Sequence, residues 1–299
     1  MRLIACSVLV SLLPLLATSC RRDPPDKPTP AAGTVSVSAA NVPAPSASTS
    51  ASSTLAFARK ALAPGLVVSI VDSSQMTMNI TQPRKLDSQE TEKSERRIEV
   101  VATDGGAASR VKVTYVDKAI TEVADGQETT RRPAVRGKSY IVEQLDGKLV
   151  VTDAARTAAR KEEVDIVAAD FAQDLGKPDR MVASVPEAPL RVGDPVGPLA
   201  EWVRDELSKM GDGIEIKSCT VALRAVKNEP NGKVGAFSVK TTLSMKPRGV
   251  TITMDLEGEL AVREDGRPLA LDLGGPLVVK GGGAEGTGKV SVQQKRDYP

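Results

Sequence analysis

The stretch VTITMDLEGELAV, residues 250–262, decides the fold that this sequence predicts. Its apolar side chains occupy every second position, with Gly258 as the gap: Val250, Ile252, Met254, Leu256, Leu260 and Val262. A period of two residues is that of a β-strand with one face in a core and the other in water. We expect this strand to belong to an antiparallel sheet, because parallel strands covered on both faces are apolar throughout.

The same alternation continues on both sides of this stretch. Residues 237–245 alternate in the same way, and residues 246–249 (KPRG) between the two stretches have the composition of a hairpin turn. Further alternating runs occupy residues 75–81, 110–115, 269–273 and 290–292. Most of the folded part is therefore predicted to be antiparallel sheet.

The middle of the chain has a helical period instead. Apolar residues spaced by three and four positions predict a helix near 157–175, ended by Gly176 and Pro178, and a second helix near 199–210. The order of strands, helices and strands predicts an α+β fold. We expect a curved antiparallel β-sheet, half-barrel-like, with the two central helices packed on it or capping it.

Two resemblances accompany this outline. It is similar to the half-barrel lipoprotein carriers of the LolA/LolB type, in which a curved antiparallel sheet wraps a helix-capped apolar cavity. The stretch VPEAPLRVGD, residues 185–194, resembles the P-x-x-P-V-x-V-G-D stretch of uncharacterised secreted bacterial lipoproteins. That second resemblance implies a location and a fold but no activity. Structurally, its two prolines predict an extended segment that leads to a turn at Gly193 and Asp194.

The N-terminus has the layout of a secretory signal peptide. Arg2 precedes an apolar run from Leu3 to Leu16, and small residues lead to Cys20. The run is shorter than the roughly 20 residues that a membrane-spanning helix needs. The segment resembles the lipobox of bacterial lipoproteins, with Ala17 where Leu is usual, which implies a lipid on Cys20 and attachment to a membrane.

The sorting rule of enteric lipoproteins reads Arg21, directly after Cys20, as a signal for the outer membrane. We therefore expect an exported outer-membrane lipoprotein that faces the periplasm or the cell surface. Cleavage by an ordinary signal peptidase after Ser19 is the alternative, and it would leave Cys20 as a free thiol.

The remaining chain divides into a linker and a domain. Residues 21–53 consist mainly of Ala, Ser, Pro and Thr, a composition that cannot bury enough apolar surface to fold. We expect a disordered tether there and one α+β domain over residues 54–299.

Composition excludes several classes of function. The chain has no histidine, the commonest general base and metal ligand, and Cys219 is its single cysteine after Cys20. With 40 basic and 38 acidic side chains, it has no overall charge suited to nucleic acid. We predict no catalytic residue, no metal and no cofactor, and we expect Cys219 to be a small buried side chain rather than a reactive thiol.

Two local patterns have simpler interpretations than a ligand site. Residues 283–289 (GAEGTGK) match most of a phosphate-binding loop, but Val290 stands where a Ser or Thr would hold magnesium, so we expect a hairpin turn and no nucleotide. Asp170 and Asp174 lie four residues apart on the first helix. Like charges at this spacing usually line a solvated face rather than share a cation.

Methionines on the apolar side of the predicted strands are the most suggestive residues. Methionine fits varied apolar partners, but it also fills irregular gaps in a core. The possible ligand-lining residues are Met76, Met78, Met245, Met254 and Leu256. We predict a lipid-anchored envelope lipoprotein with a non-catalytic structural or protein-interaction role. The alternative is a carrier or sensor that binds a lipid or other apolar ligand between sheet and helices.

Overall fold

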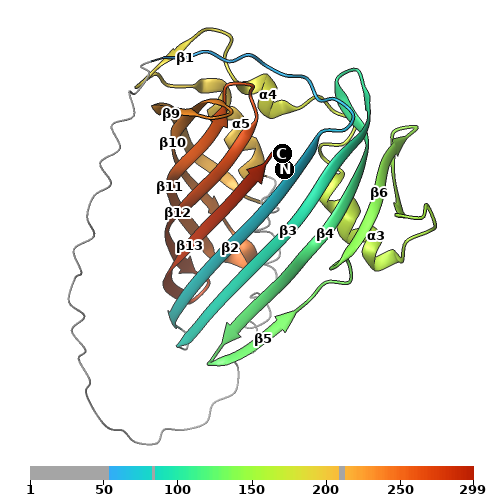
Figure 1. Ribbon diagram of the computed structural model, residues 1–299. Coiled ribbons are helices and arrows are strands. Elements are labelled where there is room, and N and C mark those ends of the chain that lie inside the picture. The colour runs from blue at the N-terminus through green and yellow to red at the C-terminus, as the bar shows by residue number, and fades with distance from the viewer. Residues whose placement is uncertain (1–53, 83–84, 209–212) are drawn as a thin grey trace, which may run out of the picture.

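The structure is a computed structural model that describes residues 54–82, 85–208 and 213–299. The predicted signal peptide, the lipidation site Cys20 and the predicted linker lie outside these residues and stay predictions. Most of the described residues are in strands, and Figure 1 shows them as one large, strongly bent sheet.

Antiparallel pairing joins eleven strands into this sheet (Figure 1). Their order is β7-β6-β4-β3-β2-β13-β12-β11-β10-β9, and β5 pairs with β4. The two end strands, β7 and β9, do not pair with each other, so the sheet is curved but open. The bounds are β2 Val67–Gln82, β3 Leu86–Asp104, β4 Ala107–Ala124, β5 Gln127–Arg131, β6 Lys138–Leu145, β7 Lys148–Asp153, β9 Glu215–Glu229, β10 Gly232–Met245, β11 Thr251–Arg263, β12 Pro268–Gly281 and β13 Ala284–Asp297.

Smaller elements complete the strand inventory. Strand β1 (Thr54–Leu55) pairs with β8 (Leu190–Arg191) in a separate two-stranded sheet. The predicted hairpin turn between β10 and β11 is a short 3₁₀ turn, Pro247–Gly249. The alternating runs that the sequence analysis singled out lie in strands, except for Val250, which directly precedes β11. The predicted α+β fold with a curved antiparallel sheet is confirmed.

Glycines on the inner face permit the bend. A Cβ atom on Gly258 of β11 would lie 1.8 Å from the carbonyl oxygen of Asp272, and one on Gly275 of β12 would lie 1.8 Å from that of Asp255. On β13, a Cβ atom at Gly288 would come within 2.0 Å of the carbonyl oxygen of Thr77. Only glycine tolerates backbones at this separation, so these positions act as kinks where the sheet curls.

Three helices belong to the described part of the chain: α3 (Lys161–Phe171), α4 (Arg180–Ser184) and α5 (Gly197–Ser208). Helix α5 packs against β9 at one end of the sheet, and α3 packs against β6 and β7 at the other (Figure 1). The first predicted helix, 157–175, is too long at both ends. Before it, Thr157 donates its backbone N–H to Asp153 at 2.8 Å and Ala158 bridges to Thr152, which holds this segment extended.

Helix α4 was not predicted, because it is only five residues long and follows the proline that we interpreted as a stop. The side chain of Asp179 caps it by accepting from the backbone N–H groups of Met181 and Val182. The segment after α4 turns at Gly193, which has a φ of 98°. The turn expected at this glycine is therefore present.

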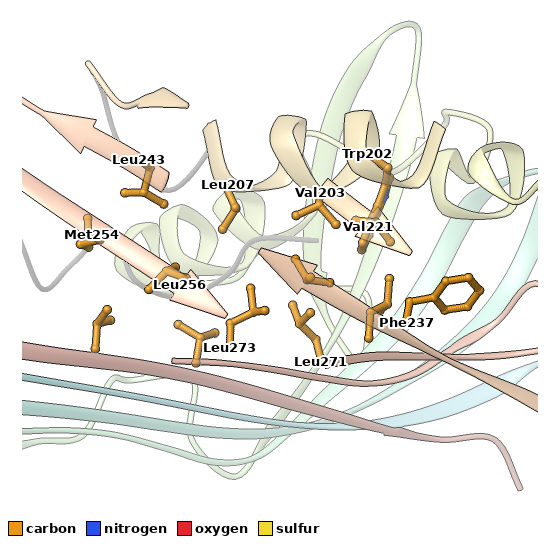
Figure 2. Close-up of a cluster of buried hydrophobic side chains, with 14 of the residues drawn as sticks. Trp202, Val203, Leu207, Val221, Phe237, Leu243, Met254, Leu256, Leu271 and Leu273 are labelled. Carbon is orange, nitrogen blue, oxygen red and sulfur yellow. The ribbon is translucent and has the colours of Figure 1, made fainter. Parts of the chain in front are cut away.

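Two hydrophobic clusters flank the centre of the sheet. The larger one contains side chains of β2, of the strands from β9 through β13, and of the helices α4 and α5. In Figure 2, Trp202, Val203 and Leu207 of α5 lie above Leu256, Leu271 and Leu273 of the sheet. The smaller cluster joins β4, β6 and β7 with Val167 and Phe171 of α3. Strand β3 runs between the two, and its inner face is polar over most of its length.

Candidate functional site

A cavity of about 210 Å³ lies between the inner face of β2 to β4, the α3–α4 segment and α5. Apolar side chains form most of its wall, including Ile70, Ile98, Val100, Phe171 and Trp202. The charged residues of its lining are Arg96, Asp170, Asp174, Lys177, Asp179, Arg180, Glu206 and Arg296. It is thus a space with an apolar part and a strongly charged part, and small-molecule sites likewise combine apolar walls with polar groups.

A buried ionic network forms one wall of this cavity. The Arg96 guanidinium of β3 lies with Nη1 3.1 Å from Asp170 of α3 and with Nη2 3.3 Å from Asp72 of β2. The Tyr115 hydroxyl of β4 donates to Asp170 at 2.7 Å. Gln294 of β13 donates to Asp72 at 2.5 Å. This network ties α3 to four neighbouring strands.

The expectation that Asp170 lines a solvated face is therefore wrong. Its side chain is only 11% exposed, because the helix turns this residue toward the sheet, where Arg96 and Tyr115 are its partners. The burial of the Tyr115 phenol beside this carboxylate raises the pKa of Tyr115. Asp174 lies after the end of α3 and also lines the cavity, but it is exposed, so the expectation of a solvated side chain is confirmed for Asp174.

The inner face of β3 continues as a polar track away from Arg96. Ser94, Glu92, Glu90 and Ser88 follow at every second position, and each is buried. The ammonium group of Lys118 on β4 lies with Nζ 3.8 Å from Glu92. Glu90 and Glu92 are 3% and 2% exposed, and neither oxygen of Glu90 has a hydrogen-bond partner within the described part of the chain.

The surroundings disfavour the charged forms of these two carboxyls. Burial raises the pKa of Glu92 to about 7, with Lys118 acting in the opposite direction. Burial also raises the pKa of Glu90, and the neighbouring Glu122 adds to the rise. A buried carboxylate without partners is costly, so the pair has unused capacity to accept hydrogen bonds or to face a cation.

The predicted ligand-lining residues lie together but elsewhere. Met76, Met78, Met245, Met254 and Leu256 all belong to the larger hydrophobic cluster, and Figure 2 shows Met254 and Leu256 in it. Met78 shares one row across the sheet with Gly288, Leu277 and Met254. None of the five lines the 210 Å³ cavity. Their contact with a ligand stays a prediction.

Sequence analysis missed the residues that form the cavity wall and the polar track. Strand β3 alternates between buried and exposed positions like the other strands, but serines, glutamates and an arginine occupy its buried positions. A search for alternating apolar residues has no signal there. Residues 88–97 have no apolar side chain at either parity, so the sequence has no local signal for a buried face there.

Other sequence features have plain structural roles. Cys219 is half-buried against the larger cluster, and burial raises the pKa of its thiol. The turn consists of Gly282 and Gly283, so only Gly283 of the phosphate-loop-like stretch lies in it, whereas residues 284–289 belong to β13. The expected hairpin turn is thus shorter than predicted, and a strand follows it where a phosphate loop needs a helix.

Two kinds of feature are absent from the described residues. No group of three or more His, Cys, Asp or Glu side chains within residues 54–82, 85–208 and 213–299 is arranged to hold a metal ion. In the same part of the chain, no helix combines the length and hydropathy of a membrane span.

No protein-family model and no curated protein sequence matches this chain. Among solved structures, it is similar to DynF from the dynemicin biosynthesis pathway of Micromonospora chersina, at 8% sequence identity. The match covers 80% of this chain and 88% of that chain, with a TM-score of 0.21. A likeness at this level carries no argument about fold or function.

Proposed function

We propose that this chain is a lipid-anchored lipoprotein of the bacterial cell envelope that binds a lipid or other apolar ligand between its curved sheet and its helices. The cavity of about 210 Å³ at that place carries the proposal. An apolar cavity of about 150 Å³ suffices for a benzene-sized guest. The space therefore suits one apolar end of a ligand, and the adjoining Arg96 network suits a polar group.

A partner-binding role without a ligand, the first expectation from the sequence, has less support. A contiguous exposed apolar patch would favour such a role. The exposed hydrophobic residues of the outer face are separated by polar neighbours. Val71 lies between Glu95 and Lys295 in the sheet, and Val278 lies between Thr253 and Thr287.

The anchor can be tested separately from the binding. The Cys20→Ala variant should move from the detergent fraction of cell membranes to the soluble periplasm or medium, because it has no acceptor for a lipid. Membrane fractionation with immunodetection measures this. Retention of the variant in the membrane fraction would contradict a lipid anchor on Cys20.

Trp202 offers a built-in reporter for the binding. It is the single tryptophan of the chain, is 4% exposed and lines the cavity. A brominated fatty alcohol should quench its fluorescence saturably in the wild-type protein. The Val100→Phe variant should lose this quenching, because Val100 lines the cavity and the larger ring would fill it.

Val101→Phe is the matched control. Val101 is the next residue of β3 and is 37% exposed, so the same ring would point away from the cavity. Quenching should be unchanged in this variant. Absence of saturable quenching in the wild type, or equal quenching in a folded Val100→Phe variant, would overturn the proposal.

A further inference from the structure

The polar track of β3 has a defined position in the sheet. Glu90 and Glu92 both face inward on β3. On the neighbouring strand β2, Met76 lies directly opposite Glu90, and Ser74 lies opposite Glu92. One strand further, Val290 and Val292 of β13 pair with Met76 and Ser74. Two carboxyls therefore border an apolar wall on one side.

Several polar atoms of this track lack hydrogen-bond partners among the described residues. Both oxygens of Glu90, one oxygen of Glu92 and the hydroxyls of Ser74 and Ser94 are buried without a hydrogen bond. Buried polar groups in native proteins are nearly always satisfied, so unmet groups at one place need an explanation. A ligand with hydrogen-bond donors would satisfy these oxygens together.

The charges around the track favour a cationic group. Lys118 lies 3.8 Å from Glu92, and Arg131 lies 3.9 Å from Glu122, the residue opposite Glu90 on β4. The three carboxyls of Glu90, Glu92 and Glu122 thus lie near only two cations, Lys118 and Arg131. Within the described residues, Glu90 forms no ion pair. A positive charge placed against Glu90 would balance the group and replace the water lost on burial.

We infer that Glu90 and Glu92 bind the ammonium group of an amphipathic amine, whose apolar part lies against Met76 and Val290. This inference rests on the proposed function, because it names the chemical class of a ligand on the same concave face, but it places the ammonium group beside the 210 Å³ cavity, whose lining includes neither Glu90 nor Glu92. The inference predicts that the protein prefers cationic to anionic amphiphiles. The whole chain carries a net charge of +2, so unspecific attraction would favour anionic amphiphiles instead.

The test compares ligands of equal chain length and different head groups. The full-length protein, anchored to liposomes of neutral phosphatidylcholine, is titrated with dodecylamine, dodecanol and dodecyl sulfate in a calorimeter, with protein-free liposomes as the blank. The amine should bind at least about tenfold more tightly than the alcohol, since one charge-assisted hydrogen bond is worth that much. The sulfate should bind most weakly.

Two variants assign the preference to the track. Glu90→Gln keeps the shape of the side chain and removes its charge, so the tenfold preference for the amine should disappear. This variant should fold, because it relieves an unpartnered buried carboxyl. Glu95→Gln is the control, since Glu95 lies on the same strand but is exposed on the outer face. It should keep the full preference.

The outcomes separate the two proposals. Equal binding of amine and alcohol by the wild type, or an amine preference that Glu90→Gln retains, would overturn the inference and leave the apolar site standing. Failure of all three amphiphiles to bind, together with absence of Trp202 quenching, would overturn the proposed function as well. Loss of the preference in Glu90→Gln but not in Glu95→Gln would support both.

Discussion

Strands β11 and β3 belong to one sheet and bury every second residue in the same way, but their inner faces are chemically opposite. Strand β11 buries Ile252, Met254, Leu256 and Leu260. Strand β3 buries two serines, two glutamates and an arginine in the corresponding row of positions. The comparison shows that strand pairing and curvature determine which positions are buried. The residue type at each buried position then determines whether the buried surface is apolar or can bind polar groups.

The two strands consequently gain stability from different sources. Each apolar side chain on β11 contributes through removal of its surface from water, about 1.5–3 kcal/mol when fully buried. The charged side chains on β3 lose hydration and must regain it from ion pairs and hydrogen bonds. We therefore expect the β11 half to stabilise the domain and the β3 half to provide recognition.

The largest effect should follow from breaking the ionic network. The Arg96→Leu variant leaves Asp72 and Asp170 buried without their common cation, and should lower the free energy of unfolding by about 3–5 kcal/mol. Urea denaturation measures it. The exposed pair Lys240–Glu257 on the outer face is the control, and Lys240→Leu should change stability by less than about 1 kcal/mol.

A further variant sharpens this result. Replacing all three charges, with Arg96→Leu, Asp72→Asn and Asp170→Asn together, should recover much of the lost stability, because no buried charge is then left alone. A single Arg96→Leu variant as stable as the wild type would show that the network is not buried as described.

The apolar half should respond by cavity formation. Leu260 of β11 is 0% exposed within the larger cluster, so Leu260→Ala should cost about 2–5 kcal/mol. Urea denaturation measures this loss as well. On the same strand, Thr253→Ala should have a much smaller effect, because Thr253 is only partly buried on the other side. Equal losses from both substitutions would remove the distinction between the faces of β11.

The smallest effect is a pH dependence that only the β3 half should show. The pKa of Glu92 is about 7 in the folded protein and near 4.5 for a glutamate in water, so the folded state binds this proton more tightly. The contribution of Glu92 to the free energy of unfolding is fully present below pH 4.5 and is lost as the pH rises to about 7 and beyond. Its upper limit is about 3 kcal/mol.

The Glu92→Gln variant should therefore lose less stability than the wild type between pH 4.5 and pH 8. Urea denaturation of both proteins across this range gives the difference, and it cancels the contributions of groups that they share. Parallel pH profiles for the two proteins would show that Glu92 does not carry the effect.

Local sequence signals predicted much of this architecture and little of its site. The run from Val250 to Val262 specifies its strand without help from the rest of the chain, because the period of two and the apolar side chains agree. The helix near Val167 and Phe171 was also recognisable from spacing, but its ends were not, since Asp153 and the segment after Phe171 compete with the helix through specific hydrogen bonds.

Strand β3 shows where such reasoning stops. Glu90, Glu92 and Arg96 look like solvated residues in the sequence, and their burial follows only from the position of β3 between β2 and β4. Likewise, Asp170 reaches Arg96 across 74 positions of the chain. Such contacts depend on how distant segments meet, which no local pattern encodes.

The sequence by itself determined the class of fold, the inward face of the apolar strands and the absence of histidine chemistry, since each depends on residue types and on spacing along the chain. Only the tertiary structure decided that β13 pairs with β2 at the centre of the sheet, that inward glycines bend it, and that carboxyls are buried on β3. The physical reason is that burial is a property of the assembled sheet: a side chain loses water only when segments from both ends of the chain close around it.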